Sequence, residues 1–267
     1  MRPLLSRVLV AIVLLPLVIG LVYLGDWWLF GLALVGGLIA LHELYRIARE
    51  LRPLVIAGYI GFVLALLGAE LGGAAWLLGG MLSTFLCSFL VFGLSDTRPS
   101  ATSSFGTTLL GVLWVGGGIG CLLLVRDIPD FGFWAVMAVL FSVFAADTAA
   151  FFVGRTLGRH KLAPAISPGK TWEGFVGGLV AGTLVAFLIL YRDREEFLSI
   201  PESLAFGALV TLASAAGDLF ESSVKRDLGV KDSGRLLAGH GGMLDRIDAL
   251  LFAGPAAYFT ILAFGAG

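Results

Sequence analysis

The sequence predicts an all-α, polytopic integral membrane protein with about nine transmembrane helices and a cytoplasmic N-terminus. Of its 267 residues, 58% are hydrophobic and only 14% are charged, whereas soluble domains carry about 25% charged residues. Apolar runs recur along the chain, each long enough for a helix of about 20 residues to cross a bilayer. The 37 glycines suit membrane helices that pack closely through small residues.

The apolar runs give the order of the expected helices. The first run follows Arg2 and Arg7, and no small-residue cleavage site comes after it, so we expect an uncleaved span rather than a removed signal peptide. The third and fourth runs are separated only by residues 70–73. The expected spans are 8–24, 27–47, 54–70, 72–94, 107–125, 132–153, 174–191, 203–219 and 244–265.

Lys and Arg residues indicate the orientation of these spans. With the N-terminus in the cytoplasm, the loops after spans two, four, six and eight hold most of the basic residues, as the positive-inside rule requires. The opposite loops hold only Arg126, Arg192 and Arg194. The two loops richest in polar residues then face the cytoplasm, where nucleotides are found.

Composition also suggests how the chain is organised. We expect residues 1–130 to form a scaffold of membrane helices and residues 131–267 to form a catalytic region with two cytoplasmic polar loops. Within the second region, Gly174, Gly178 and Gly182 lie four residues apart, which predicts a face for close helix packing. The net charge of −1 gives no indication of nucleic acid as a partner.

The stretch from Gly217 to Asp248 holds an unusual concentration of polar residues. If a helix runs through Ser223, then Asp218 and three neighbours share one of its faces, and Asp245 and Asp248 share a face at the start of the next helix. The glycines of residues 239–242 form a hinge, so the chain can fold back and bring Asp218 toward the other two acids. The neighbours of Asp218 on its face are Glu221, Ser222 and Lys225.

Acids at membrane depth need a compensating charge. An Asp at the centre of a membrane helix costs about 2.5–3.5 kcal/mol on the insertion scale, and Mg²⁺ prefers carboxylate oxygens together with substrate phosphates. We therefore expect Asp218, Asp245 and Asp248 to bind Mg²⁺. The alternative is a solvated loop with ordinary ion pairs. Phosphate-binding charge is expected from Lys225, Arg226, Lys231 and Arg235.

A second polar constellation runs from Asp147 to Gly174. Asp147 lies within the sixth apolar run and is a functional candidate, with a buried structural hydrogen bond as the alternative. The basic loop after it either binds anions or anchors the chain at the cytoplasmic face. A turn at residues 167–169 is expected to lead into a helix near Thr171, whose N-terminus, with Lys170, is suited to binding an anion.

Other patterns are weaker. Gly169, Lys170 and Thr171 resemble the end of a Walker A loop, but no strand is expected before them and Pro164 replaces the first glycine. His42 and Glu43 begin like a zinc-protease motif that lacks its second histidine, so we expect Glu43 to cap its helix or pair with Arg46. Ala215 replaces the glycine of an intramembrane aspartyl protease motif, and His160 is expected to have no specific role.

The segment Ser222 to Asp248 closely resembles the signature of the phosphatidate cytidylyltransferase family, whose members are also called CDP-diacylglycerol synthases. That signature is S-x-hydrophobic-K-R, four residues, K-D, and then H-G-G-x-x-D-R-x-D, and the sequence here is SSVKRDLGVKDSGRLLAGHGGMLDRID. The segments SPGKTWEG and Asp147 to Arg155 also resemble the family. Ala238 and Phe151 depart from its usual residues, but neither removes a charged position.

The resemblance implies a reaction in which CTP and phosphatidic acid form CDP-diacylglycerol and pyrophosphate for phospholipid synthesis. Because this reaction joins two polyanions, we expect two Mg²⁺ ions, with Asp147 either a further ligand or a support for the metal. Catalytic roles are expected for Asp218, Asp245, Asp248 and Lys225, and His240 either donates to the leaving pyrophosphate or shapes the hinge. The resemblance also implies a homodimer in the bacterial inner membrane. Another lipid phosphate as substrate and an ion-coupled transporter remain alternatives. Substrate-binding residues are expected at Lys170, Thr171, Ser222, Arg226, Lys231, Asp232, Arg235 and Arg246.

Overall fold

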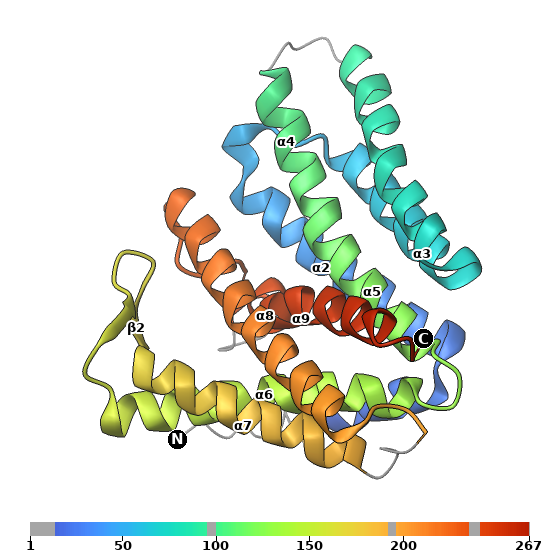
Figure 1. Ribbon diagram of the computed structural model, residues 1–267. Helices are drawn as coiled ribbons and strands as arrows, with labels where there is room; N and C mark the ends of the chain where they lie inside the picture. Colours follow the sequence, from blue (N-terminus) through green and yellow to red (C-terminus); the bar gives the residue numbers. More distant parts are fainter. Residues whose placement is uncertain (1–13, 95–99, 192–195, 235–240, 267) are drawn as a thin grey trace. The chain divides into compact units, whose positions relative to one another are not determined.

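The computed structural model describes residues 14–94, 100–191, 196–234 and 241–266, and it is almost entirely helical (Figure 1). A short apolar helix, Leu14–Leu24, comes first. The later elements are α2 (Asp26–Ile47), η1 (Arg49–Leu51), α3 (Val55–Gly93), α4 (Ala101–Gly111), η2 (Val112–Gly116), α5 (Gly117–Arg126), α6 (Gly132–Leu157), β1 (Lys161–Ala163), β2 (Ser167–Thr171), α7 (Trp172–Leu190), α8 (Ile200–Asp227) and α9 (Leu244–Ala263).

The chain divides into two compact units. The first unit comprises Met1–Leu124 and Leu228–Ile247, and the second comprises Val125–Asp227 and Asp248–Gly267. The polar stretch from Gly217 to Asp248 is therefore shared between the two units. The expected division of roles between residues 1–130 and 131–267 stays a prediction.

In the first unit, α3 is a hairpin of two helical arms. Its backbone leaves the helical conformation at Gly73, with φ 71° and ψ −158°, and a positive φ of this kind favours glycine. The two arms then pack backbone to backbone, because a Cβ at Gly80 would overlap the backbone of Ala65. The third and fourth predicted spans, 54–70 and 72–94, correspond to these arms.

A buried tyrosine joins α2 to the segment that follows α3. The Tyr45 hydroxyl donates a hydrogen bond of 2.8 Å to the carbonyl of Thr108. The Tyr45 ring lies against Gly58 on one side and Gly111 on the other, where no side chain would fit. The small residues of α3 and α4 thus let three helices approach one aromatic ring, as expected for packing within a membrane.

In the second unit, α6, α7 and α8 pack together (Figure 1). The predicted glycine face of α7 is confirmed: a Cβ at Gly174 would lie 2.7 Å from the carbonyl of Ala150, and one at Gly178 would lie 2.8 Å from that of Ala146. Gly182 continues the same face against Ser142 and Thr211. These contacts bring α6 and α7 close along most of their lengths.

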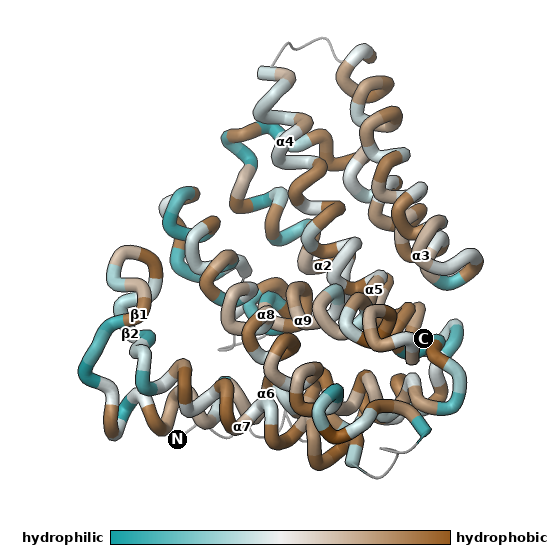
Figure 2. The backbone as a smooth tube through the Cα atoms, viewed as in Figure 1, coloured by the Kyte–Doolittle hydropathy of each residue, from teal (hydrophilic) through white to brown (hydrophobic). Residues whose placement is uncertain are grey.

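The loop between α6 and α7 contains a short antiparallel β-hairpin, in which Lys161 pairs with Thr171 and Ala163 pairs with Ser167. The predicted turn at residues 167–169 is wrong, because these residues belong to β2. The predicted helix start is correct: Thr171 caps α7 and its hydroxyl accepts a 3.1 Å hydrogen bond from the Gly174 N–H. Figure 2 shows hydrophilic residues between α6 and β1, beside the largely hydrophobic α6 and α7.

Among the described residues, seven helices are long and apolar enough to cross a membrane. The protein is therefore an integral membrane protein of almost entirely α-helical structure. One of the seven is the 39-residue hairpin α3, and the first predicted span lies partly outside the described residues. The count of nine spans and the cytoplasmic N-terminus stay predictions.

Candidate functional site

A cavity of about 580 Å³ lies in the second unit. Asp147 of α6, Lys170 of β2 and Asp218 of α8 are among its lining residues, together with Thr171 and Ser214. The hairpin contributes Ser167 and Gly169 to its wall. Residues from both polar constellations of the sequence, Asp147 and Lys170 from one and Asp218 from the other, therefore line one cavity.

Lys170 and Asp218 form an ion pair across this cavity. The Lys170 Nζ lies 2.6 Å from the Asp218 Oδ2, and the two side chains are 24% and 37% exposed. Lys170 is held in place because it directly precedes the capping residue of α7. The predicted association of Lys170 with the start of a helix is thus confirmed, and its charge is directed toward the acid of α8.

Asp218 also interacts with two further carboxylates. The charge of Asp218 acts on Asp147 of α6 and on Asp248 of α9. Gly217 makes the approach of α9 possible, because a Cβ there would lie 2.6 Å from the Asp248 carbonyl. The chain therefore folds back as expected and brings Asp218 and Asp248 together. The Asp248 carboxylate is 8% exposed and accepts a hydrogen bond from the Ala249 N–H.

This donor set fits a hard divalent cation in its chemistry, because Asp147, Asp218 and Asp248 supply only carboxylate oxygens. Their geometry is not that of a formed metal site: within the described parts of the chain, no three His, Cys, Asp or Glu side chains are placed to hold one ion. The Lys170 ammonium instead supplies the positive charge beside Asp218. The role of these acids as metal ligands stays a prediction.

The basic residues at the end of α8 are already engaged. Lys225 Nζ lies 2.6 Å from the Glu221 Oε2, and their side chains are 14% and 2% exposed. Arg226 donates through Nε to the carbonyl of Ile166, at the turn of the hairpin. Ser222 lies between these contacts on α8 and is half-buried. Lys225 and Arg226 therefore support the acidic face of α8 and the hairpin in this structure.

A glutamate fixes the base of the hairpin. The Glu173 carboxylate accepts hydrogen bonds from the backbone N–H groups of Arg159 and His160, and it lies 2.6 Å from the His160 Nδ1. The expectation that His160 has no specific role is wrong, because its ring pairs with the first turn of α7. Glu173, which the sequence did not single out, acts as the tie between the end of α6 and the start of α7.

In the first unit, Asp245 binds both described parts of the loop after α8, residues 228–234 and 241–243, which together are called the signature loop. Its carboxylate accepts a 2.7 Å hydrogen bond from the Gly242 N–H and longer ones from the Ser233 N–H. The loop approaches closely at Gly241, which has φ +80° and where a Cβ would lie 2.7 Å from the Asp245 Oδ2. In this structure Asp245 stabilises backbone, and its predicted metal role is untested.

Glu43 of α2 is the site residue that the sequence missed. Its side chain is 4% exposed, and its Oε2 accepts hydrogen bonds from the Leu244 N–H at 2.9 Å and the Ser233 hydroxyl at 3.2 Å. The expectation that Glu43 caps its own helix or pairs with Arg46 is therefore wrong. Its carboxylate reaches residues 190 and 201 positions away in the chain.

Two glycines of the signature loop leave room for this carboxylate. A Cβ at Gly234 would overlap the Glu43 Oε1, and a Cβ at Gly242 would overlap the Glu43 Oε2 and the Ser233 hydroxyl. Both described parts of the loop therefore approach the Glu43 carboxylate, and each has a glycine where its backbone passes close to it. Of the other predicted binding residues, Lys231, Asp232 and Arg246 are exposed, and Arg235 and His240 lie outside the described residues.

Fold and site together define an α-helical integral membrane protein whose buried acids and lysines gather where membrane helices end in polar loops. Residues 5–264 match the family described as the Cytidylyltransferase family, and the chain belongs to that family.

Relatives from several bacteria are all named phosphatidate cytidylyltransferase. The chain is 35% identical to the phosphatidate cytidylyltransferase of Pseudomonas aeruginosa, over 98% of this chain and 97% of the relative. It is 32% identical to that of Bacillus subtilis, over 97% of both. It is 34% identical to that of Mycobacterium bovis, over 92% of this chain and 84% of the relative.

Proposed function

We propose that this protein is a nucleotidyltransferase that makes CDP-diacylglycerol and pyrophosphate from CTP and phosphatidic acid. Its membership of the cytidylyltransferase family and the shared name of its relatives support this activity. The observation that carries the proposal is the meeting of Lys170, Asp218 and Asp147 at one cavity. Neither the matched family nor the names of these relatives indicate an ion-coupled transporter.

The chemistry requires two polyanions to approach each other, and the lipid phosphate is itself the nucleophile. A phosphoryl transfer of this kind depends on positioning and charge stabilisation more than on general-base catalysis. Lys170 is the residue placed to bind a phosphate, because its ammonium lies in the cavity wall and is one quarter exposed. Phosphate binding there would displace the Asp218 carboxylate from Lys170.

Release of Asp218 from Lys170 leaves a carboxylate free beside Asp248 and Asp147. We propose that these three acids hold Mg²⁺, and the metal role expected for Asp245 from the sequence stays a prediction. Magnesium in such sites neutralises the charge that develops on phosphate oxygens. The three carboxylates would then orient the ion and position the two substrates. Lys225 would hold the Glu221 carboxylate in place on α8.

The arrangement in the cell is also part of the proposal. The distribution of Lys and Arg favours a cytoplasmic N-terminus and polar loops on the cytoplasmic side. For a bacterial chain like its relatives, the membrane would be the inner membrane. CTP would then arrive from the cytoplasm, and phosphatidic acid would enter laterally from the bilayer. A homodimer is the expected assembly.

The test is a reaction with purified protein, labelled CTP, Mg²⁺ and a panel of lipid phosphates in detergent micelles. Phosphatidic acid should give labelled CDP-diacylglycerol and one equivalent of pyrophosphate, and both should vanish with EDTA. Asp218→Asn is the matched inactive variant. Product with a polyprenyl phosphate but none with phosphatidic acid would refute the lipid assignment, and no pyrophosphate with any lipid would refute the reaction.

A further inference from the structure

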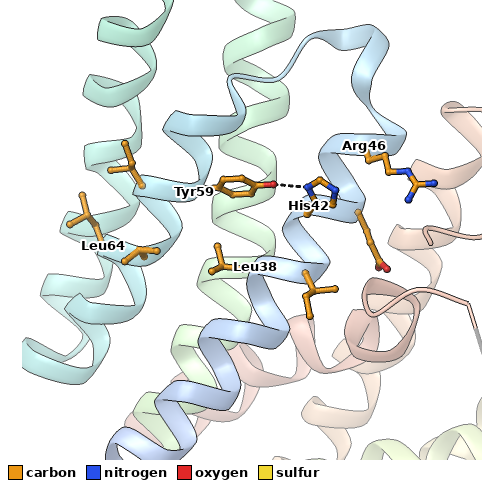
Figure 3. A pocket seen from close by; sticks show the side chains of 9 residues that line it. Leu38, His42, Arg46, Tyr59 and Leu64 are labelled. Carbon is orange, nitrogen blue, oxygen red and sulfur yellow. Dashed lines mark hydrogen bonds between the residues drawn. The ribbon is translucent and has the colours of Figure 1, made fainter. Parts of the chain in front are cut away.

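The first unit contains a cavity of about 870 Å³ between α2 and the first arm of α3 (Figure 3). Its volume is in the range of ligand pockets, about 300–1,000 Å³. Leu38, Ile60, Val63 and Leu64 line most of it. Two of these side chains, Ile60 and Leu64, are 43% and 40% exposed, so the groove is open along its apolar side.

The polar residues of this groove lie at one end. His42 and Arg46 lie in the last two turns of α2, and Tyr59 lies near the start of α3. His42 Nδ1 and the Tyr59 hydroxyl are 2.7 Å apart and orient each other (Figure 3). Leu38 lies two turns before Arg46, about 12 Å along the helix. The groove therefore changes from polar to apolar along its length.

This gradient matches the shape of a phospholipid. Arg46 is exposed, and no carboxylate among the described residues forms an ion pair with it. Arg46, His42 and Tyr59 line the same groove, and a guanidinium, an imidazole and a hydroxyl can supply several donors to one phosphate. Arginines at the end of a membrane helix face the headgroup layer, and the apolar end of the groove then lies at the depth of acyl chains.

The polar end also adjoins the signature loop. Glu43 lies between His42 and Arg46 in the sequence, it lines the same groove, and its carboxylate accepts the Leu244 N–H. A lipid with its phosphate at Arg46 would therefore present that phosphate next to the loop that Asp245 stabilises. A groove that only held lipids of the surrounding bilayer would not need a residue in contact with this loop.

We propose that this groove binds the lipid substrate, phosphatidic acid, with one acyl chain along Leu38, Ile60 and Leu64 and its phosphate against Arg46 and His42. The proposal rests on the function proposed above and names where the lipid is held. It commits to phosphatidic acid rather than to a lipid of the surrounding bilayer, because the phosphate monoester carries the extra negative charge that Arg46 can bind.

The first experiment fills the groove. Leu64→Trp should raise the KM for dioleoyl phosphatidic acid at least about tenfold, since a chain that loses a few buried methylenes loses that much affinity. The KM values for CTP and for dihexanoyl phosphatidic acid should not change. Leu71→Trp is the matched control, because Leu71 is 62% exposed on the same helix and does not line the groove. Equal effects on both chain lengths, or none, would overturn the proposal.

The phosphate end has its own matched pair. Arg46→Gln should raise the KM for both lipids about tenfold, as the loss of a charged contact predicts, and Arg49→Gln should not. Arg49 lies three residues further on, is also exposed, and is absent from the groove. Equal KM values for the two variants would remove Arg46 from the binding site.

A binding measurement separates this proposal from the proposed reaction. At lipid concentrations well above its raised KM, the tryptophan of Leu64→Trp should be quenched more strongly by brominated phosphatidic acid than by brominated phosphatidylcholine, relative to Leu71→Trp, in micelles of equal bromine content. Selective quenching by brominated phosphatidic acid in a protein that transfers no cytidylyl group would refute the proposed reaction and support the lipid-binding site. Equal quenching by both lipids would show that the groove holds only bulk lipid, and the site would be refuted even in an active enzyme.

Discussion

Glu43 is far from the signature loop in sequence, yet it holds that loop in place, and its removal should disable the enzyme. Glu43→Ala leaves two donors without their acceptor, the Leu244 N–H and the Ser233 hydroxyl. An unsatisfied buried donor costs about 1–3 kcal/mol, so the ordered loop should lose about 2–6 kcal/mol. Since about 1.4 kcal/mol is tenfold, its ordered form becomes at least roughly 30-fold less favourable.

The measurement is the rate of CDP-diacylglycerol formation by equal amounts of inserted protein. Glu43→Ala should lower kcat at least about tenfold, because the loop must be ordered at each turnover. Glu43→Gln keeps an oxygen where the acceptor was, and it loses only the charge-assisted part of two hydrogen bonds. It should therefore retain clearly more activity than the alanine variant.

Glu50→Ala is the matched control. Glu50 lies in η1 of the same unit and is exposed, so its loss should change kcat by less than about twofold. If Glu43→Ala retains the wild-type rate, the loop does not depend on this carboxylate. If the alanine and glutamine variants lose equal activity, the negative charge matters and the hydrogen-bond reasoning fails.

The remaining predictions concern α8, α9 and the hairpin. Asp218→Asn and Asp248→Asn should each lower CDP-diacylglycerol formation more than about 100-fold with normal insertion, and a retained rate would remove that acid from the site. Lys225→Met removes the ammonium that pairs with the buried Glu221 carboxylate, and breaking a buried ion pair costs about 3–5 kcal/mol. Thermal melting in detergent should show this loss, and adding Glu221→Gln should restore the melting temperature. A melting temperature unchanged by Lys225→Met would refute the pairing. Glu173→Ala removes the acceptor of two backbone N–H groups, so the hairpin should loosen and the KM for CTP should rise. An unchanged KM would show that the hairpin does not contribute to CTP binding.

Local patterns in the sequence were sufficient for much of the structure. The apolar runs predicted the membrane helices, and the four-residue glycine spacing predicted the face of α7, because both signals depend on neighbours within one helix. The start of α7 near Thr171 was also predicted, but from an expected turn at residues 167–169, which belong to β2, and the structure shows that Thr171 caps the helix. The approach of Asp218 and Asp248 was predicted from two helices that each carry an acid near the glycine-containing segment that joins them.

The contacts that the sequence could not predict join distant segments. Glu43 lies 190 residues before Ser233 and 201 before Leu244, and nothing in its own helix distinguishes it from a glutamate paired with a nearby arginine. The β-hairpin was missed because three- and five-residue strands are too short to show an alternating pattern. The partner of His160 was missed because Glu173 belongs to the first turn of a helix, where acids occur for the helix dipole alone.

The structure changes how the signature of this family is understood in this chain. Its charged residues suggest chemistry, but Gly234 and Gly242 have a steric reason, since a side chain at either would overlap the carboxylate of Glu43. Asp245 likewise binds the backbone of the loop from within the signature. Part of the pattern therefore encodes a loop folded around a buried acid of α2. Because α2 also lines the lipid groove, a lipid bound there would act directly on the element that holds this loop, which gives the substrate a physical route to order it.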